Sequence, residues 1–445
     1  MTTPDDSPSD AAITTLNERI AARTATIAVI GLGYVGLPTA VAYAEAGFTV
    51  VGVDSDAGRA ESVGRGDSHV EDVSAGSVSA AVQSGRLRAV TDVAEAGRFD
   101  VADICVHTPL DVRHEPDLTA ITLAAEALVP SLHAGQLVIL TSTSYPGTTA
   151  EVVAPILARS GLDVGRELLL AFAPERIDPG NRDYTFRNTP KVVGGVTPAS
   201  TDTAAALLGA IVDSVVRVGD ATAAEMVKIL ENTFRMVNIG FANEMAMICR
   251  RLGIDVWEVI DAASTKPFGF MPFRPGPGLG GHCIPVDPSY LAWKMRNLNF
   301  KTRFIDLGND INRGMPDYVV GRCADVLNEL SLSVRRARIL LIGVAYKPDV
   351  GDIRESPALE IAQRLIDLGA DVVYADSHVA RAVTDAGTAL GSIELTAAEV
   401  ERADLVVVAT DHAGTDWAMV GASAKLILDT RGVTALRAAT GWRTL

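Results

Sequence analysis

The sequence has little of what several classes of protein require. Its 445 residues include only four cysteines, widely spaced and without a C-x-x-C pair, which argues against a disulfide framework and against a cysteine zinc site. The formal net charge is −16, so no extended basic face is expected for a nucleic acid. No apolar run reaches membrane-spanning length. These absences predict a cytoplasmic protein that binds neither nucleic acid nor membrane and holds no metal.

The composition describes a globular chain with ample core. Hydrophobic residues make up 48% of the sequence and charged residues 21%, and a length of 445 residues predicts two or three domains. The first ten residues are rich in Thr, Ser, Pro and Asp and have neither the basic nor the apolar region of a signal peptide. We therefore expect residues 1–24 to form a disordered tail.

The first predicted strand, Thr26–Ile30, leads directly into a glycine-rich turn, Gly31-Leu-Gly33-Tyr-Val-Gly36. A helical pattern and a second strand follow, and that strand ends at Asp54. Strand, turn, helix and acid in this order form the full context of a dinucleotide-binding fingerprint. A purely structural βα turn is the weaker alternative.

Each residue of this motif has its own physical task. Gly31 permits the tight turn, Gly33 lets the backbone approach a pyrophosphate, and Gly36 lets the helix pack on the strand, while the helix N-terminus stabilises the phosphates. The carboxylate of Asp54 accepts the ribose hydroxyls and repels a 2′-phosphate, so we predict NAD and not NADP. The predicted cofactor site also includes Tyr34, Val35 and Arg59.

Polar residues follow the next three predicted strands. Thr108 comes after Val101–Val106, Thr143 comes after Leu137–Thr141, and Glu175 and Arg176 come after Leu168–Ala173. Because the carboxyl ends of parallel strands line the ligand crevice, we expect contacts with cofactor or substrate at this edge. Each threonine taken alone is as well explained as a helix N-cap.

A long helix is predicted from Ala221 to about Leu252, with Gly240 as its one breaker. About thirty residues at about 1.5 Å each would span nearly 50 Å, which is too long for one domain, so this helix should connect domains. Most of its circumference is apolar, which favours burial against a second copy of the chain in a homodimer. Lys228 and Asn232 lie on one face of it, where an ordinary solvated stripe is the alternative.

The segment Gly276–Asp287 has the sequence Gly-Pro-Gly-Leu-Gly-Gly-His-Cys-Ile-Pro-Val-Asp. Its four glycines and two prolines argue against an ordinary helix or strand. It carries one thiol, Cys283, with Asp287 four residues later. A lone cysteine is more often a small core residue, but a shaped loop favours an exposed nucleophile.

Beyond a polar link near residue 335 the chain repeats its beginning. A strand at Arg338–Ile342 ends at Gly343, a helix follows at Pro357–Leu368, and a second strand occupies Asp371–Ala375. This copy has Ala345 in place of the second glycine, and its longer turn adds Lys347 and Arg354. We therefore predict that the copy binds a different anion, through side-chain charge.

The loop with Cys283 and Asp287, the helix with Lys228 and Asn232, and the Lys347…Arg354-Glu-Ser-Pro turn together resemble the UDP-glucose/GDP-mannose dehydrogenase family, from about Thr26 onward. With the α/β alternation, this resemblance implies two Rossmann-like doubly wound parallel-sheet domains joined by a helical core with a long central helix. The expected domains are 25–218 for NAD, 219–332 for dimerisation and catalysis, and 333–445 for the UDP-sugar.

Within the family, Pro174–Gly180, Lys266–Phe273 and His282 resemble the UDP-N-acetylglucosamine 6-dehydrogenases, which oxidise the sugar C6 alcohol to a carboxylate with two NAD⁺ and one water. UDP-N-acetylmannosamine and UDP-glucose remain alternative substrates. A two-electron 3-hydroxyacid dehydrogenase and an inactive nucleotide-sugar sensor are the alternatives from other classes. Two departures are Pro179, where the glucose branch has a second glutamate, and Pro267, where many relatives have an arginine.

The resemblance also implies residue roles. Cys283 would carry a thiohemiacetal and then a thioester, and Lys228 and Asn232 would stabilise the oxyanion at C6. Asp287, with Thr143 and a water, would act as general base, and Glu175 would orient the hydrolytic water. Further substrate contacts are expected from Arg176, Arg274, Gly280, Lys347 and Arg431, and a nicotinamide contact from Arg354.

Overall fold

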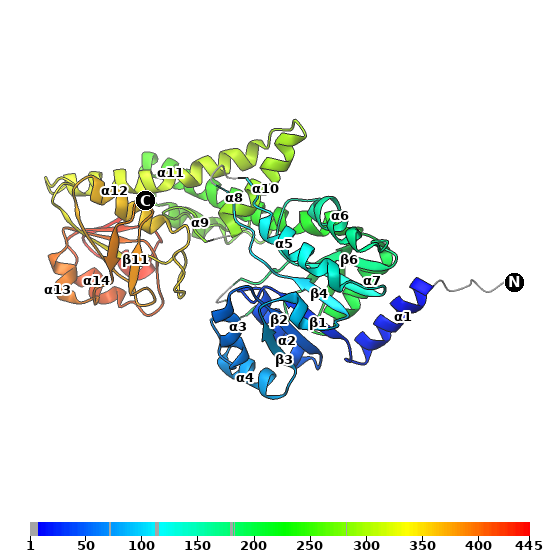
Figure 1. The fold of residues 1–445 in the computed structure, drawn as a ribbon. Helices are drawn as coiled ribbons and strands as arrows, with labels where there is room; N and C mark the ends of the chain where they lie inside the picture. The colour runs from blue at the N-terminus through cyan, green and yellow to red at the C-terminus, as the bar shows by residue number, and fades with distance from the viewer. Residues whose placement is uncertain (1–7, 71–72, 112–114, 179–180, 182, 282) are drawn as a thin grey trace. The chain divides into compact units, whose positions relative to one another are not determined.

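The computed structural model describes residues 8–445 except 71–72, 112–114, 179–180, 182 and 282. By their internal contacts the residues form two compact units. The first contains the chain up to Glu231 together with Ser289–Leu298, and the second contains Asn232–Pro288 and Asn299–Leu445. Figure 1 labels the helices of both units and some of their strands.

The first unit is built on an eight-stranded sheet of order β3-β2-β1-β4-β5-β6-β7-β8. The neighbouring strands are parallel except for β6 and β7. The strands are β1 (Thr26–Ile30), β2 (Thr49–Val53), β3 (Leu87–Val90), β4 (Val101–Ile104), β5 (Gln136–Leu140), β6 (Leu168–Phe172), β7 (Lys191–Gly195) and β8 (Val215–Arg217). The α-helices are α1 (Pro8–Ala21), α2 (Gly36–Glu45), α3 (Ala57–Gly64), α4 (Ala75–Gln83), α5 (Thr119–Leu128), α6 (Ala154–Leu157) and α7 (Pro198–Leu208). This is the predicted doubly wound α/β arrangement, with its switch point between β1 and β4.

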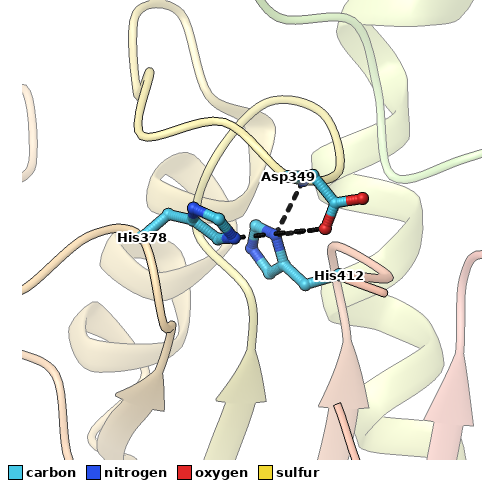
Figure 2. A group of neighbouring side chains, drawn as sticks. All are labelled: Asp349, His378 and His412. Atoms are coloured by element: carbon cyan, nitrogen blue, oxygen red, sulfur yellow. Dashed lines mark hydrogen bonds and ion pairs between the residues drawn. The ribbon is translucent and has the colours of Figure 1, made fainter. Parts of the chain in front are cut away.

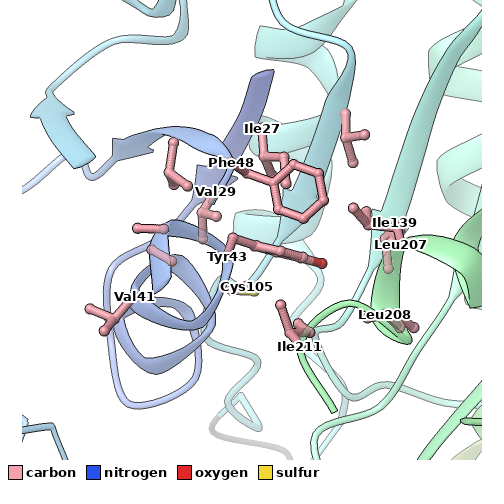
Figure 3. Packing of buried hydrophobic residues seen from close by; sticks show 14 of the residues in the cluster. Ile27, Val29, Val41, Tyr43, Phe48, Cys105, Ile139, Leu207, Leu208 and Ile211 are labelled. Atoms are coloured by element: carbon pink, nitrogen blue, oxygen red, sulfur yellow. The ribbon is translucent and has the colours of Figure 1, made fainter. Parts of the chain in front are cut away.

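Both faces of this sheet are buried. Along β1, Ile27 and Val29 belong to one core cluster and Ala28 and Ile30 to the other, because successive side chains of a strand point to opposite faces. Figure 3 shows the first cluster, in which Ile27 and Val29 lie near Tyr43, Phe48, Ile139, Leu207, Leu208 and Ile211. A strand that is buried on both faces needs a nearly continuous apolar sequence, and β1 has one.

The N-terminal segment differs from the disordered tail expected for residues 1–24. Residues 8–21 form α1, and Leu16 and Ile20, one turn apart, are buried in the first core cluster. The helix packs on α7. The Thr, Ser, Pro and Asp content of the first ten residues obscured this short apolar stripe, which is stabilised by tertiary burial and not by helix propensity.

Four helices form the middle of the chain: α8 (Ala221–Leu252), α9 (Val256–Ala263), α10 (Cys283–Asn297) and α11 (Arg303–Asn328). The side chain of Asp220 accepts a hydrogen bond from the Ala223 N–H at the start of α8. α8 has the predicted bounds and 32 residues. In the second unit α8 and α11 approach closely at Gly240 and Gly308, where an added Cβ on Gly240 would lie 3.2 Å from the Gly308 Cα.

The second unit contains a five-stranded parallel sheet of order β10-β9-β13-β14-β15 and a separate hairpin of β11 and β12. Its strands are β9 (Arg338–Ile342), β10 (Asp371–Ala375), β11 (Arg381–Val383), β12 (Ala389–Gly391), β13 (Leu405–Val408), β14 (Ile427–Asp429) and β15 (Trp442–Thr444). Its remaining helices are α12 (Pro357–Asp367), α13 (Ala397–Arg402) and α14 (Trp417–Ser423). Among the described residues, none of the helices is long and apolar enough to cross a membrane.

The second sheet repeats the first strand-turn-helix unit, as its sequence predicts. The Gly343 N–H donates to the Ala375 carbonyl oxygen at 2.9 Å, just as the Gly31 N–H donates to the Val53 carbonyl oxygen at 2.7 Å. Both glycines have positive φ, 79° and 94°. The two domains therefore have the same backbone geometry at the end of the first strand. They differ in the side chains of the rest of the turn.

Candidate functional site

The turn after β1 has the shape that the glycine motif predicts. A Cβ on Gly31 would lie 2.7 Å from the Cys105 carbonyl oxygen, and one on Gly36 would lie 1.7 Å from the Gly31 carbonyl oxygen. Gly33 is different, because an added Cβ would meet nothing within 4 Å. Its surroundings are open, so backbone there is accessible to a phosphate group at the N-terminus of α2. Tyr34 is exposed beside it, and Val35 is the N-cap residue of α2.

The acid at the end of β2 is buried and engaged. The Leu32 N–H donates to Asp54 Oδ2 at 2.9 Å, and Arg59 Nη1 forms an ion pair with the same oxygen at 3.0 Å. The Asp56 N–H donates to Oδ1. These contacts hold the carboxylate at the edge of the turn, where it accepts the ribose hydroxyls in dinucleotide-binding folds.

The carboxyl ends of β4, β5 and β6 bring three predicted residues to one edge of the sheet. Thr108 is buried and its carbonyl oxygen accepts a hydrogen bond from the Tyr290 hydroxyl. Thr143 is half-buried beyond β5. Glu175 lies beyond β6, where Lys191, the first residue of the antiparallel β7, reaches the same edge. Because β4, β5 and β6 are adjacent, the topology confirms that these positions share an edge.

Glu175 is held in place by three donors. Its Oε1 accepts the Arg176 and Ile177 N–H groups at 2.7 and 2.9 Å, and its Oε2 lies 2.5 Å from Lys191 Nζ. Burial alone would raise the pKa of Glu175, but the Lys191 charge and the hydrogen bonds outweigh it, so the pKa lies below its ordinary value. Glu175 is therefore a weak base that is suited to orienting a water.

Lys191 was missed by the sequence analysis, although a charged residue that opens an apolar strand was a signal. Only 5% of its side chain is exposed, and its ammonium also lies 4.6 Å from the centroid of the Phe186 ring. Arg176 is likewise paired, because its guanidinium donates to both carboxylate oxygens of Glu231, at 3.2 and 2.5 Å. Its predicted role in substrate binding would require exchange of this partner.

The first part of α8 carries a buried cation. Lys228 is 9% exposed, and its ammonium makes no hydrogen bond or ion pair with any residue that the structure describes. Three residues earlier, Glu225 accepts the Thr149 N–H and hydroxyl at 2.8 and 2.6 Å and the Gly147 N–H at 2.5 Å. Glu225 thus fixes α8 against the turn that follows β5. An ammonium in this position can pair with an anionic ligand.

In the second unit, Asn232 and Asp287 are in direct contact. Asn232 Nδ2 donates to Asp287 Oδ2 at 2.5 Å, and Asp287 is 2% exposed. The sequence analysis assigned catalytic roles to both residues but did not predict that they are in contact. Asp287 lies in the first turns of α10, which begins at Cys283.

The start of α10 corrects one expectation. Residues 283–287 are helical, although the glycines and prolines of Gly276–Asp287 argued against a helix. Pro285 is tolerated because the N–H groups of a first helical turn need no partner within the helix. Cys283 is the first residue of this helix. The side chain of Cys283 and the residues His282 and Pro179 lie outside what the structure describes.

The glycines before α10 permit close packing on the turn between β9 and α12. A Cβ on Gly280 would lie 2.6 Å from the Tyr346 Cβ, and the Gly281 N–H donates to the Arg354 carbonyl oxygen at 2.9 Å. At the other end of the loop, the Gly276 N–H donates to Asn243 Oδ1 at 2.9 Å. Asn243, on α8, donates in turn to Asn312 Oδ1 of α11 at 2.9 Å. Polar residues inside apolar helices were the signal for this buried amide pair, which the sequence analysis did not use.

The cations predicted for the nucleotide differ in their surroundings. Arg431 is half-buried, and its Nε donates to the Ala409 carbonyl oxygen at 2.7 Å. Burial lowers the pKa of Arg431, although Asp411 and Asp429 act against this. Its Nη1 approaches Gly276, where an added Cβ would lie 3.0 Å away. Lys347 is half-buried, 6.0 Å from the centroid of the Tyr346 ring.

Two predicted arginines already have carboxylate partners. Arg354 Nη2 lies 2.6 Å from Asp352 Oδ2. Arg274 Nη2 lies 2.7 Å from Asp261 Oδ1, and its guanidinium lies 5.9 Å from the centroid of the Trp257 ring. The side chains of Arg354 and Arg274 are 49% and 54% exposed. The structure brings Gly280, Arg431 and the Lys347 turn together around one loop, while Arg274 is attached to α9.

Three family models match successive parts of the chain. They are described as the NAD binding domain, the central domain and the UDP binding domain of the UDP-glucose/GDP-mannose dehydrogenase family, and they match residues 25–212, 222–314 and 340–435.

Among curated proteins, the UDP-N-acetyl-D-mannosamine dehydrogenase of Yersinia pestis is 37% identical over 400 residues, which cover 87% of this chain and 93% of the relative. That of Escherichia coli strain K12 is 40% identical over 352 residues, 76% of this chain and 82% of the relative. The solved UDP-D-ManNAc dehydrogenase of Pyrococcus horikoshii has a TM-score of 0.85 at 33% identity, covering 94% and 98% of the two chains.

Proposed function

Because this chain belongs to the UDP-glucose/GDP-mannose dehydrogenase family and is therefore an NAD-dependent UDP-sugar dehydrogenase, we propose that it oxidises the C6 alcohol of a UDP-2-acetamido sugar to the carboxylate. The observation that carries this proposal is the Asn232–Asp287 hydrogen bond. Asn232 lies one helical turn after Lys228 on α8, and Asp287 lies one turn after Cys283 on α10. The hydrogen bond therefore joins two predicted catalytic side chains from separate helices. An alcohol oxidation needs such a group of base, donor and cation around one carbon.

The described residues fit NAD. Gly33 leaves open space at the helix N-terminus, Gly31 adopts the positive φ of a tight turn, and Asp54 is held at the end of β2. When bound, NAD⁺ would supply the hydride acceptor for both oxidation steps of one turnover, so that two molecules are consumed per sugar.

The protein residues have complementary tasks in this proposal. Asp287 takes the C6 hydroxyl proton, through a water, as hydride leaves C6, and the product of this first step is the C6 aldehyde. The thiolate of Cys283 adds to the aldehyde carbon and forms a thiohemiacetal, which holds the intermediate without releasing it. Lys228 and Asn232 stabilise the oxyanion on C6, and the low exposure of Lys228 supports this role.

Loss of a second hydride converts the thiohemiacetal into a thioester. Water then attacks the thioester carbonyl, the C–S bond breaks, and the carboxylate and the Cys283 thiolate are released. Glu175 is proposed to orient this water, since its lowered pKa keeps it an acceptor. Cys283 is the first residue of α10, where the helix dipole favours an anion, and this position supports a thiolate nucleophile.

For the substrate, we propose UDP-N-acetyl-D-mannosamine. Relatives named as dehydrogenases of this sugar are 34–40% identical to the chain. The motif Pro174–Gly180, the segment Lys266–Phe273 and His282 favoured UDP-N-acetylglucosamine instead, and that sugar remains the second candidate. Both carry a 2-acetamido group, and the two differ only in configuration at C2.

A panel of UDP-N-acetylmannosamine, UDP-N-acetylglucosamine and UDP-glucose, with NADH absorbance as the readout, tests the proposal. We expect two NADH per sugar. We also expect kcat/KM for the mannosamine sugar to exceed that for UDP-glucose by roughly 10⁴-fold, because the protein groups that hydrogen-bond the acetamido group would have no partner when a plain 2-hydroxyl binds. Preference for UDP-N-acetylglucosamine would move the assignment to that sugar. One NADH per substrate would exclude the four-electron reaction.

A homodimer through the central helix is the second part of the proposal. On the second-unit part of α8, Phe241 and Ile248 are 57% and 41% exposed, and on α11 Phe304 and Leu307 are 77% and 55% exposed. A face this apolar is unusual for a monomer in water. A second copy of the chain would cover it, and such isologous pairing is the commonest form of oligomer.

A further inference from the structure

We propose that Asp349, His378 and His412 form a binding site for a divalent transition-metal ion of the zinc class. The three come from the turn after β9, the loop after β10 and the loop after β13, which are adjacent strands of one parallel sheet. Figure 2 shows their side chains converging above the carboxyl ends of these strands. One ligand atom from each lies within 4.8 Å of the other two.

The tautomer of His412 is fixed by its two partners. Its Nδ1 accepts the Asp349 N–H at 3.0 Å, and a backbone N–H can only donate. Its Nε2 lies 3.1 Å from Asp376 Oδ2, so Nε2 carries the proton and donates to that carboxylate. Asp376 Oδ2 also accepts the Val344 and Ala345 N–H groups, at 2.7 and 3.1 Å. Asp376 Oδ2 is therefore the acceptor of three donors, one of which is the His412 Nε2–H.

This arrangement is the one found behind metal-bound histidines. A ligating imidazole usually donates its other N–H to a carboxylate, which orients the ring and raises the basicity of the ligand nitrogen. His412 is 2% exposed and oriented by Asp376, and the one lone pair of its Nδ1 is directed at the Asp349 loop, where it accepts the Asp349 N–H. In the corresponding place of the first domain, Asp54 is paired with Arg59 instead.

The distances suit one ion. Asp349 Oδ1 lies 4.0 Å from His412 Nδ1 and 4.0 Å from His378 Nε2. Bonds of about 2.0–2.2 Å from zinc to nitrogen and oxygen can bridge such a gap once the Asp349 N–H has moved away from His412 Nδ1. The His378 and His412 rings are tilted by 31° relative to each other, with 4.8 Å between their centroids. Two imidazoles and one carboxylate are ligands that Zn²⁺ accepts, with the fourth position left to water.

The carboxylate is already directed toward the site. Asp349 Oδ1 accepts the Ala413 N–H at 2.9 Å, so the residue after His412 holds it beside the imidazole. Binding of the ion exchanges one hydrogen bond, from the Asp349 N–H to Nδ1, for a metal bond. His378 and Asp349 are 38% and 50% exposed in their side chains, which gives an ion a path from solvent.

The consequence concerns the turn from Val344 to Ser356. This turn holds Lys347 and packs on the loop that leads to Cys283. An ion on Asp349, His378 and His412 would fasten the turn to the ends of β10 and β13. The site itself does not depend on the proposed dehydrogenase activity.

The test is zinc binding to the chelator-treated full chain, measured calorimetrically with ZnCl₂ alone and spectroscopically with Co²⁺. A Cys283→Ser background removes the thiol, which is itself a strong zinc ligand. We expect one ion per chain and visible absorption bands of tetrahedral Co²⁺. His378→Ala should weaken zinc binding by about 100-fold or more, since loss of an outer partner alone costs 10- to 100-fold.

Asp349→Asn is the second variant, because asparagine tolerates the positive φ of 60° at this position and keeps an oxygen for the Ala413 N–H. It should weaken zinc binding without altering the thermal unfolding of the metal-free protein. His107→Ala is the matched control, because it removes an exposed imidazole from the NAD domain and should leave zinc affinity unchanged. Absence of zinc binding, or equal affinity in His378→Ala and the parent, would overturn the proposal.

Discussion

At the scale of single residues, the fold gives Cys283 a position that its loop sequence did not suggest. The segment before it is irregular, but Cys283 itself begins α10, and Asp287 lies one turn further along the same helix. Asp287 in turn receives a hydrogen bond from Asn232. The residues proposed as nucleophile, base and amide donor thus belong to two helices, α10 and α8.

Replacing the thiol tests the covalent step. Cys283→Ser should abolish formation of the sugar carboxylate, because a serine hydroxyl is far less ionised than a thiol and a poorer leaving group from the acyl intermediate. NAD⁺ affinity should stay unchanged, since the dinucleotide motif lies in a separate domain. Product analysis by mass spectrometry and NAD⁺ titration give the two readouts. Steady turnover of the serine variant to the acid would refute a covalent role.

The Glu175–Lys191 pair predicts a measurable stability effect. Lys191→Met leaves a buried carboxylate without its counter-ion, and should lower the free energy of unfolding by about 3–5 kcal/mol at pH 7. Urea titration of the intact chain measures this. Arg187→Met is the control, because the Arg187–Asp213 pair is 81% and 56% exposed and exposed pairs contribute below about 1 kcal/mol. Equal effects of the two substitutions would contradict the burial argument.

The same pair sets a pH dependence. The folded-state pKa of Glu175 lies below its ordinary value, so its contribution to stability is fully present above the unfolded-state pKa of about 4.3. The contribution is lost as the pH falls from there through the lowered folded-state pKa. Glu175→Gln should therefore flatten the decline in stability of the NAD domain below about pH 4.

At the scale of elements, the turn between β9 and α12 is where the second Rossmann-like domain departs from the first. The sequence shows the departure directly, in Ala345 and Lys347. Lys347→Ala should weaken UDP-sugar binding by about 1.5–3 kcal/mol, the scale of a charge-assisted hydrogen bond, and leave NAD⁺ affinity unchanged. Calorimetric titration of both ligands decides this. Loss of NAD⁺ affinity with intact UDP-sugar affinity would mean that the two nucleotide sites are reversed.

The crossing of α8 and α11 offers a matched pair of glycines on one helix. A Cβ on Gly308 would lie 2.8 Å from the Met236 sulfur and 3.3 Å from the Val237 Cα, whereas one on Gly314 would meet nothing within 4 Å. Gly308→Ala should therefore destabilise by about 1–3 kcal/mol through overpacking. Gly314→Ala should stabilise by about 0.5–1 kcal/mol, because alanine favours a helix interior. Thermal unfolding of the two variants should shift in opposite directions.

At the scale of the whole molecule, the exposed apolar face on α8 and α11 predicts assembly. Phe241→Glu places a charge in the middle of the proposed dimer contact, and should shift the protein from dimer to monomer in size-exclusion chromatography with light scattering. Leu123→Glu is the control, because Leu123 is 59% exposed on α5 of the NAD domain and lies on no proposed contact. A parent protein that is already monomeric would remove the dimer from the proposal.

The local sequence determined the elements whose signals are local. Apolar runs and glycines specified β1, β2, β9 and β10, the positive-φ turns at Gly31 and Gly343, and the full length of α8 from Ala221 to Leu252. These features depend on residue period and on backbone freedom, which neighbouring residues decide. The family, the NAD cofactor and the α/β class followed from such motifs in order, and the comparisons and the fold confirm them.

Tertiary structure alone decided which distant side chains meet. Lys191 joins Glu175 only because β7 runs antiparallel to β6, and α1 is ordered only because Leu16 and Ile20 find a core. Asp349, His378 and His412 have no common spacing in the sequence, and they converge because β9, β10 and β13 are neighbours in the sheet. Local sequence sets the form of each segment, whereas burial and strand order, which arise from the whole chain, set the partners of its charged groups.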